Sequence, residues 1–381
     1  MRTTLITLHK YAGLLFGLLL SLTGITGSLL VFDHTLDEVL TPETVQLETS
    51  NNQASLQAVL NAAQAAVANG TEPTRLYLAR QPGSPHVVRF PPLQDAPGPL
   101  EVSVAPSDAK ALAVRTWGQY PMSWIYRLHY RLLAGTAGKY IVGVGGISLL
   151  FFCVSGLVLW WPRRGRWRRA LTIKRHSGRY RFNYDLHKTT GFYMLPLLLV
   201  IAFSGVTLVF HKATEKLVGA ILPLEKHSIP PAAPGTQTLS VDQIVAIGQR
   251  VFPEAELKRI YLPQSPTDSY RLAFNRPGEP WTNHAVSGLW IDPYNGQVLE
   301  KRDYRTMASG SKFLAWLFPL HNGDALGLIG RWLVLICGWL PGLLFITGVY
   351  MWWRKRHVIR RSNTVANEVL LLLKGRATAK E

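Results

Sequence analysis

Four long apolar runs, separated by polar stretches, dominate the pattern of hydrophobic and polar positions along this chain. The runs cover roughly residues 11–32, 140–161, 192–210 and 330–353, and each is nearly free of charged side chains. A helix needs about 20 residues to cross the hydrocarbon core of a bilayer. The pattern therefore predicts a polytopic α-helical membrane protein with four transmembrane helices.

The four runs belong to an internal duplication. The motif LHKYAG at 8–13 returns as LHKTTG at 186–191, an offset of 178 residues, and each copy opens an apolar run. A second set of positions returns at an offset of 192 residues; it pairs His129 with His321, Ser155-Gly156 with Thr347-Gly348, and Trp160-Trp161 with Trp352-Trp353. Each half thus carries histidines at the boundaries of its apolar runs, where ionisable side chains are usually functional.

The polar stretch inside each half predicts a small α+β domain. In the first half, an Ala-rich helix at 56–68 precedes short strands at 75–78, 87–90 and 101–104. In the second half, a helix at 241–252, with Ser240 at its N-cap, precedes strands at 259–262, 269–274 and 289–291. Short alternating strands broken by Pro, Asn and Gly are typical of antiparallel hairpins.

Positive charge is concentrated on one side of the predicted membrane. The formal net charge is +18, and arginines and lysines crowd the loop at 162–186 and the stretch after the last span. Short basic loops stay in the cytoplasm and attract anionic lipid head groups. We therefore expect both termini and this loop in the cytoplasm, the two α+β domains outside, a lipid bilayer as partner and no nucleic acid.

These expectations divide the chain into ten segments. The first half holds a transmembrane helix (1–33), an outside domain (34–116), an interfacial segment (117–138) and a second transmembrane helix (139–161). A basic cytoplasmic loop (162–186) joins the halves. The second half holds a transmembrane helix (187–211), an outside domain (212–312), an interfacial segment (313–329), a fourth transmembrane helix (330–353) and a cytoplasmic tail (354–381).

Three motifs together resemble the PepSY-associated transmembrane helix family of iron-regulated membrane proteins. They are the Leu-His-Lys opening of each unit, the turn Asp292-Pro-Tyr-Asn-Gly296 and the closing (Ser/Thr)-Gly-x3-Trp-Trp followed by Arg. The resemblance covers roughly residues 5–357 and is nearest to the FoxB-type ferric-siderophore reductases, which hold haem. It implies a bacterial inner-membrane protein with PepSY-like periplasmic domains. The first domain departs from the pattern, with Ala105-Pro-Ser-Asp in place of the turn.

Two pairs of equivalent histidines are the candidate cofactor ligands. His9 and His187 lie at the inner ends of the first and third runs, and His129 and His321 lie at the outer side. Two neutral imidazoles on either face of a haem form a common electron-transfer site, and no Cys-x2-Cys-His is present for covalent attachment. We predict two haem b groups, with iron bound by His9 and His187 near the cytoplasm and by His129 and His321 near the outside.

His34 and His211, near the outer ends of the first and third runs, miss equivalence by one residue. A competing scheme places one of them in the outer site, and another pairs His34 with His129 and His211 with His321. The 25 residues from His9 to His34 span about 37 Å of helix, so ligands at both faces would place two centres in series across the membrane. His86, His227 and His284, in the outside domains, are predicted to be solvated.

The resemblance and the histidines imply an oxidoreductase. It would take electrons from an unidentified donor and pass them across the membrane to a ferric siderophore, releasing iron as Fe(II). Two alternatives stay open: a PepSY-type binding or regulatory membrane protein with structural histidines, and a siderophore permease without redox activity.

Overall fold

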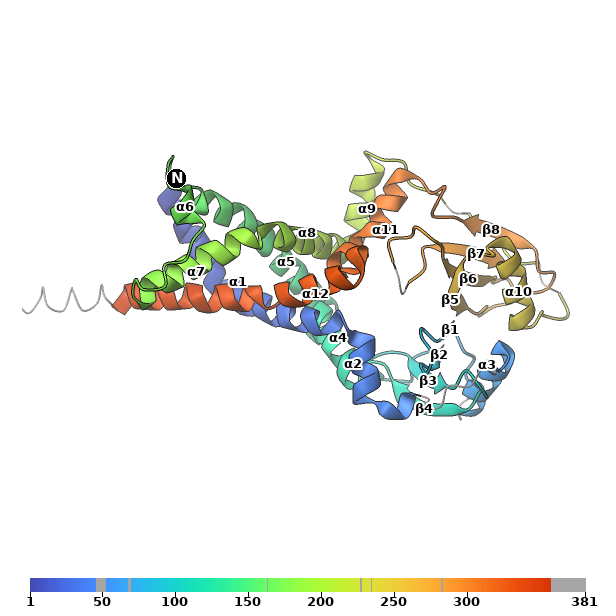
Figure 1. Ribbon diagram of the computed structural model, residues 1–381. Helices are drawn as coiled ribbons and strands as arrows, with labels where there is room; N and C mark the ends of the chain where they lie inside the picture. Colours follow the sequence, from blue (N-terminus) through green and yellow to red (C-terminus); the bar gives the residue numbers. More distant parts are fainter. Residues whose placement is uncertain are drawn as a thin grey trace, which may run out of the picture.

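The computed structural model describes residues 1–45, 53–67, 70–162, 164–226, 228–233, 235–281 and 284–357. A bundle of long helices forms one end of the molecule, and a β-sheet with two covering helices forms the other (Figure 1). We call these the basic end, where α6 (Trp167–Ala170) and its arginines lie, and the sheet end.

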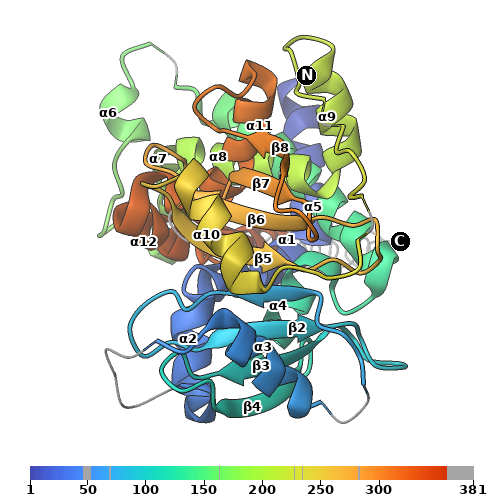
Figure 2. The same cartoon turned by 90° about the vertical axis from the view of Figure 1, so that its right-hand side faces the viewer.

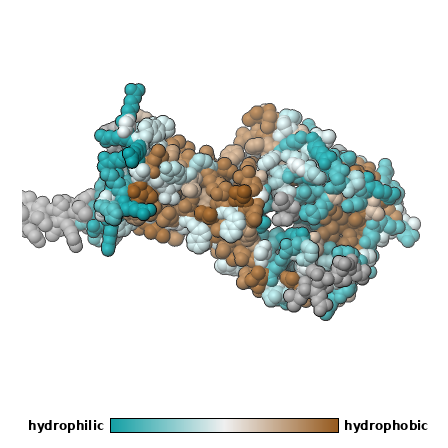
Figure 3. Space-filling view, in the orientation of Figure 1, coloured by the Kyte–Doolittle hydropathy of each residue, from teal (hydrophilic) through white to brown (hydrophobic). Residues whose placement is uncertain are grey.

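The bundle contains the elements that can span a membrane. Among the described residues, three helices are long and apolar enough: α1 (Arg2–Leu30), α5 (Gly135–Trp160) and the stretch Asp324–His357, which includes α12 (Gly327–Cys337) and a further helix at 340–357. A bent pair of helices brings the number to as many as four. Many of their apolar side chains are exposed, and Figure 3 shows them as a band between two hydrophilic ends. Intrahelical hydrogen bonds satisfy the backbone in such helices, so lipid can cover them.

The third span differs from the single transmembrane helix predicted at 187–211. It consists of α7 (Arg179–Tyr193) and α8 (Leu195–Val209), which meet at an angle of 62°. Pro196 stands in the first turn of α8. Because proline lacks an N–H and its ring clashes with the preceding turn, a helix that reaches it bends or restarts.

Each predicted interfacial segment contains an amphipathic helix, and the flanking linkers contain short ones. The two equivalent helices are α4 (Pro121–Arg131) and α11 (Ser309–Asn322), each placed directly before a membrane helix. The short elements are α2 (Asp33–Leu40), η1 (Pro42–Thr44), α9 (His211–Gly219) and η2 (Asp324–Leu326).

The two predicted α+β domains form one continuous antiparallel sheet. Its eight strands run in the order β4-β3-β2-β1-β5-β6-β7-β8. The strands are β1 (Arg75–Tyr77), β2 (His86–Phe90), β3 (Leu100–Val104), β4 (Ala111–Thr116), β5 (Glu256–Tyr261), β6 (Tyr270–Asn275), β7 (Ser287–Ile291) and β8 (Val298–Arg302). The halves meet where β1 pairs with β5. We call the four strands of each half a lobe. Without this pairing, β1 and β5 would each be an edge strand with unpaired backbone groups.

One hydrophobic core lies under one face of this sheet. Helices α3 (Leu56–Ala65) and α10 (Val241–Val251) cover it, and they lie on the side of the sheet away from the membrane helices (Figure 2). Fully buried core side chains include Leu76 of β1 and Ile260 of β5, which pair across the junction. Ser240 caps α10 as predicted, in a capping box with Gln243. The Asp242 carboxylate of α10 also accepts two backbone hydrogen bonds at the start of α3, which link the two covering helices.

Candidate functional site

The inner histidines lie toward the basic end and make equivalent contacts. His9 of α1 places its Nδ1 2.7 Å from the Ser155 hydroxyl of α5. His187 of α7 places its Nδ1 2.8 Å from the Thr347 hydroxyl of the last helix. Among the described residues, no hydrogen bond or ring contact joins these two imidazoles directly. Both halves therefore hold the inner histidine through the hydroxyl of their closing (Ser/Thr)-Gly motif.

The structure brings the two outer histidines close together, with their ring planes tilted by 47°. His129 of α4 and His321 of α11 have ring centroids 6.2 Å apart. The Nδ1 atom of His129 lies 2.9 Å from the backbone carbonyl of Thr23 in α1. The Nδ1 atom of His321 lies 3.1 Å from the carbonyl of Ile201 in α8. These contacts are also equivalent by the repeat.

The hydrogen-bond partners assign one tautomer to all four rings. A backbone carbonyl only accepts, so His129 and His321 must donate from Nδ1–H. The hydroxyls of Ser155 and Thr347 already donate to the carbonyl four residues earlier, at 2.7 and 2.8 Å, so they accept from His9 and His187. Each Nε2 then carries a lone pair and is the atom available to a metal. A partner at the other nitrogen that fixes ring and tautomer is the usual arrangement of a metal-binding histidine.

Glycines give the rings room against the helices. A Cβ atom at Gly27 would lie 2.8 Å from Cε1 of His129, and one at Gly205 would lie 2.9 Å from Cε1 of His321. At the inner level, a Cβ at Gly156 or Gly348 would touch the histidine at an ordinary 3.8 Å. Gly27 and Gly205 therefore accommodate imidazoles, and the outer site depends on them.

The donor set fits haem iron between paired imidazoles. A metal with one Nε2 about 2 Å away on each side sets the ring centroids roughly 6 Å apart, close to the spacing of His129 and His321. No group of three or more His, Cys, Asp or Glu side chains suited to a metal occurs in the part of the chain that the structure describes. Cys153 and Cys337 are free thiols packed among leucines. The candidate donors in the described residues are two pairs of single histidines.

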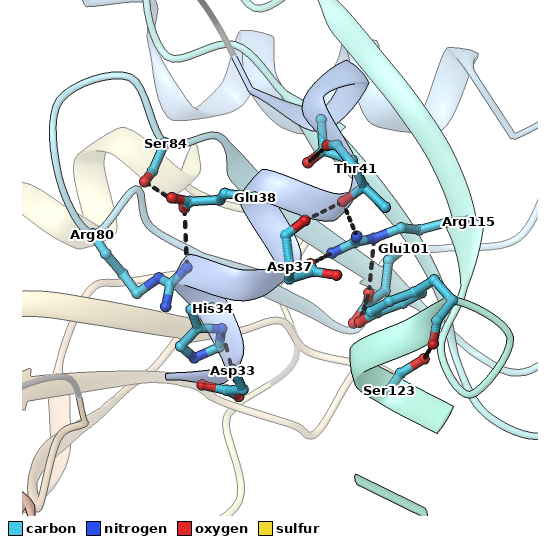
Figure 4. A network of polar contacts seen from close by, with 12 residues as sticks. Asp33, His34, Asp37, Glu38, Thr41, Arg80, Ser84, Glu101, Arg115 and Ser123 are labelled. Atoms are coloured by element: carbon cyan, nitrogen blue, oxygen red, sulfur yellow. Dashed lines mark hydrogen bonds and ion pairs between the residues drawn. The ribbon is translucent and has the colours of Figure 1, made fainter. Parts of the chain in front are cut away.

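The structure places the two remaining candidates elsewhere. His34, on α2, is half exposed and lies 3.8 Å from Asp33, near the Arg80–Glu38 ion pair (Figure 4). Burial of the surrounding region, followed by the charges of Arg80 and Arg331, lowers the pKa of His34. His211, on α9, is exposed and lies 4.0 Å from Glu215. Among the described residues, no hydrogen bond or ring contact joins either imidazole to the outer pair.

The outside histidines correct the prediction that they are solvated. His86 is buried in β2, and its Nδ1 accepts a hydrogen bond from the Ala79 backbone at 2.9 Å. His284 is half-buried and lies 3.2 Å from a nitrogen of Arg259. Burial lowers the pKa of His86 to about 4, and burial together with Arg259 lowers that of His284 to about 3. His227 lies outside the described residues. Nothing in the local sequence marks these contacts, which arise from packing of the loops.

Comparison with known proteins identifies the family. The family model described as the PepSY-associated TM region matches residues 6–355. The chain belongs to the PepSY-associated transmembrane family. It is also 26% identical over 252 residues to the "Uncharacterized protein PA4219" of Pseudomonas aeruginosa, in a match that covers 61% of this chain and 63% of that relative. The chain thus spans less than two thirds of that relative's length. The match to the family model confirms the family membership predicted from the sequence motifs.

Proposed function

We propose that this member of the PepSY-associated transmembrane family is a haem-holding reductase. It would accept electrons from a donor on the cytoplasmic side and deliver them to a ferric siderophore in the periplasm of a bacterial inner membrane. The basic end would then face the cytoplasm, as positively charged loops do, and the sheet end would face the periplasm. The observation that carries the proposal is the pair His129 and His321, with both Nδ1 atoms held and their rings 6.2 Å apart.

Haem iron between two imidazoles supplies one-electron transfer without acid or base groups from the protein. The residues of this chain set where that chemistry occurs. Ser155 and Thr347 orient the inner imidazoles, and the backbone of α1 and α8 orients the outer ones. Iron bound by hard oxygen donors is held less firmly as Fe(II), so one electron loosens a ferric siderophore without breaking its organic part.

The purified protein tests this proposal directly. The pigment should show a sharp α band on reduction and a content of two haem groups per chain. Dithionite-reduced protein should then be reoxidised by a ferric siderophore. Colourless protein after expression with ample haem would remove the proposal and favour the binding or regulatory alternative.

The permease alternative has one feature in its favour. The bend of 62° between α7 and α8 resembles the discontinuous helices that line transporter sites. Pro196 explains this bend locally, and the two helices carry His187 (α7) and the Ile201 carbonyl (α8) that the candidate sites use. Pigment-free transport of a siderophore by reconstituted protein would favour the permease, whereas haem content without transport would exclude it.

A further inference from the structure

A single row of charged and aromatic side chains crosses the sheet on the face that α3 and α10 leave open. The strand register places one residue of the row on each strand, and cross-strand partners point to the same face. From β4 to β8 the row reads Arg115, Glu101, Arg89, Arg75, Tyr261, Arg271, Trp290 and Glu300. The alternate positions, such as Leu76 and Ile260, face the core.

The centre of the row is the junction between the two halves. There, Arg75 pairs with Tyr261 and Tyr77 pairs with Arg259, so that the sequences Arg-Leu-Tyr and Arg-Ile-Tyr face each other in antiparallel. The guanidinium of Arg75 lies 5.1 Å from the ring centre of Tyr261, and that of Arg259 lies 4.3 Å from the ring centre of Tyr77. The duplication thus places two arginines and two tyrosines about the line where the halves meet.

Among the described residues, the arginines of β2 and β4 have carboxylate partners, whereas those at and beside the junction do not. In the first lobe, Arg89 pairs with Glu101 at 2.6 Å. Arg115 pairs with Asp37 of α2 at 2.7 Å, as Figure 4 shows. In the described part of the chain, Arg75, Arg259 and Arg271 have no carboxylate within ion-pair distance. We call these three residues the arginine cluster.

The cluster forms a locally positive surface. Desolvation and the neighbouring guanidinium groups of Arg302, Arg259 and Arg75 together lower the pKa of Arg271. Burial alone would raise the pKa of Tyr261, but the surrounding arginines lower it instead. Among the residues that the structure describes, the buried Nε atoms of Arg259 and Arg271 meet no hydrogen-bond partner. Like charges held together without an anion are destabilising, and an anionic ligand would relieve this.

This face of the sheet looks toward the membrane helices and the outer histidines. Figure 2 shows α3 and α10 in front of the strands and the membrane helices behind them. Arg259 contacts His284, and in the same loop Trp281 stacks on Phe318 of α11 with ring centroids 4.8 Å apart. Phe318 lies one helical turn before His321. A cavity of about 420 Å³ borders the row, with Arg271, Trp290 and Asp268 in its wall. The Asp268 carboxylate accepts a hydrogen bond from the Gln264 backbone.

We propose that the arginine cluster binds an anionic Fe(III) chelate whose iron is held by aromatic oxygen donors, such as a catecholate. This inference rests on the proposed reductase function and names its substrate class. Arginine pairs with oxyanions through two parallel hydrogen bonds and also stacks on aromatic rings, so it suits both parts of such a ligand. Neutral or cationic hydroxamate chelates lack the charge that this surface complements.

A redox-silent chelate separates binding from reduction. The probe is Ga(III) tris-catecholate, added to the full-length protein in detergent and followed by titration calorimetry. Arg271→Gln should weaken binding roughly tenfold, and the double variant Arg75→Gln/Arg259→Gln should weaken it more. Arg250→Gln, an exposed arginine on α10 behind the sheet, is the matched control and should bind as the wild type does. Thermal unfolding of each variant checks that the sheet is intact.

The dependence of wild-type binding on salt provides a second measurement that needs no variant. Affinity for the anionic chelate should fall steeply as NaCl is raised, and a neutral Ga(III) hydroxamate should not compete. Equal affinity of folded arginine variants and wild type, or binding that ignores salt, would overturn the proposal. If the gallium chelate binds as expected but reduced protein is never reoxidised by the iron chelate, the reductase function fails while the binding site stands.

Discussion

The inner and outer histidine pairs use the same tautomer but different acceptors. At the inner level, the Nδ1 atoms of His9 and His187 bond to side-chain hydroxyls. At the outer level, those of His129 and His321 bond to backbone carbonyls of helices. A hydroxyl acceptor can be removed by changing one side chain, whereas a carbonyl acceptor cannot.

Glycines leave the outer acceptors, which are backbone carbonyls, accessible to the imidazoles. Gly27 lies four residues after Thr23, and Gly205 lies four residues after Ile201, so each glycine is above the carbonyl on the same helix face. A side chain there would cover the carbonyl and collide with the imidazole. A carbonyl has two lone pairs, so it accepts from histidine while it keeps its helical bond. At the inner level a side-chain hydroxyl accepts the Nδ1–H hydrogen bond. At the outer level a backbone carbonyl accepts it, and the nearby glycine leaves space for the ring.

Removing an imidazole should give the largest effect and should separate the levels. In the proposed arrangement only the outer iron would lose a ligand, so His129→Ala or His321→Ala should lower the haem content from two groups per chain to one and leave the inner site. His9→Ala or His187→Ala should do the converse. The measurement is haem per protein together with the Soret spectrum of the purified variants.

The matched controls are His34→Ala and His211→Ala, which should keep both haem groups. A loss of haem in either control would revive the competing ligand schemes. Full haem content after loss of His129 would show that the outer pair is not a ligand pair.

Removing a hydroxyl should weaken only the inner site. Ser155→Ala or Thr347→Val deletes the acceptor that fixes His9 or His187, and loss of such a partner typically lowers metal affinity by 10- to 100-fold. Haem transfer to apomyoglobin, followed spectroscopically, measures the affinity of each site. Thr26→Val is the matched control at the outer level, because the Thr26 hydroxyl is 3.3 Å from His129 and secondary to the carbonyl. Equal weakening by all three changes would contradict the division between hydroxyl and backbone acceptors.

Much of this architecture could be predicted from the duplicated sequence. The offset of 192 residues paired His129 with His321, and the structure brings these two rings together. Alternation of apolar residues marked six strands, and Ser240 marked the start of α10. The missing strands β4 and β8 are half-exposed along most of their length and lack a clear alternation, so the pattern was too weak to show them.

The remaining features depend on contacts that sequence order does not contain. The fusion of two lobes through β1 and β5 joins residues far apart in the chain, and a three-residue strand gives little signal by itself. The backbone acceptors of the outer histidines belong to another helix. Every residue has a carbonyl, so the residue types do not show which one accepts a hydrogen bond. The bend before Pro196 was open to prediction, because proline inside an apolar run is a known cause of kinks.

Filling the glycine space should disturb the outer site less than removing its ligands. Gly27→Ala or Gly205→Ala places a methyl group 2.8 or 2.9 Å from an imidazole carbon. Overpacking of this kind usually costs about 1–3 kcal/mol, so haem affinity at the outer site should fall roughly tenfold. Gly13→Ala is the control, since a methyl group there meets no atom within 4 Å. Haem transfer kinetics would detect the change, and an unaltered outer site in both glycine variants would mean that the helices shift freely.

The smallest effect should come from His86. Its Nδ1 atom accepts a hydrogen bond, whereas the Nδ1 atoms of the four ligand candidates donate one. Its Nδ1 accepts a hydrogen bond from the Ala79 N–H, so this nitrogen must stay unprotonated in the folded sheet. The pKa of His86 is lowered from 6.5 to about 4 by burial, so the folded state favours the neutral ring. This contribution to stability is complete above pH 6.5 and is lost progressively as the pH falls toward 4. Between pH 7.5 and 5.5 the sheet should lose about 1 kcal/mol, with no change in haem content. Thermal unfolding followed by circular dichroism measures this loss. The His86→Gln variant should show a weaker dependence of stability on pH. An unchanged dependence in that variant would assign the loss to other groups, such as His284.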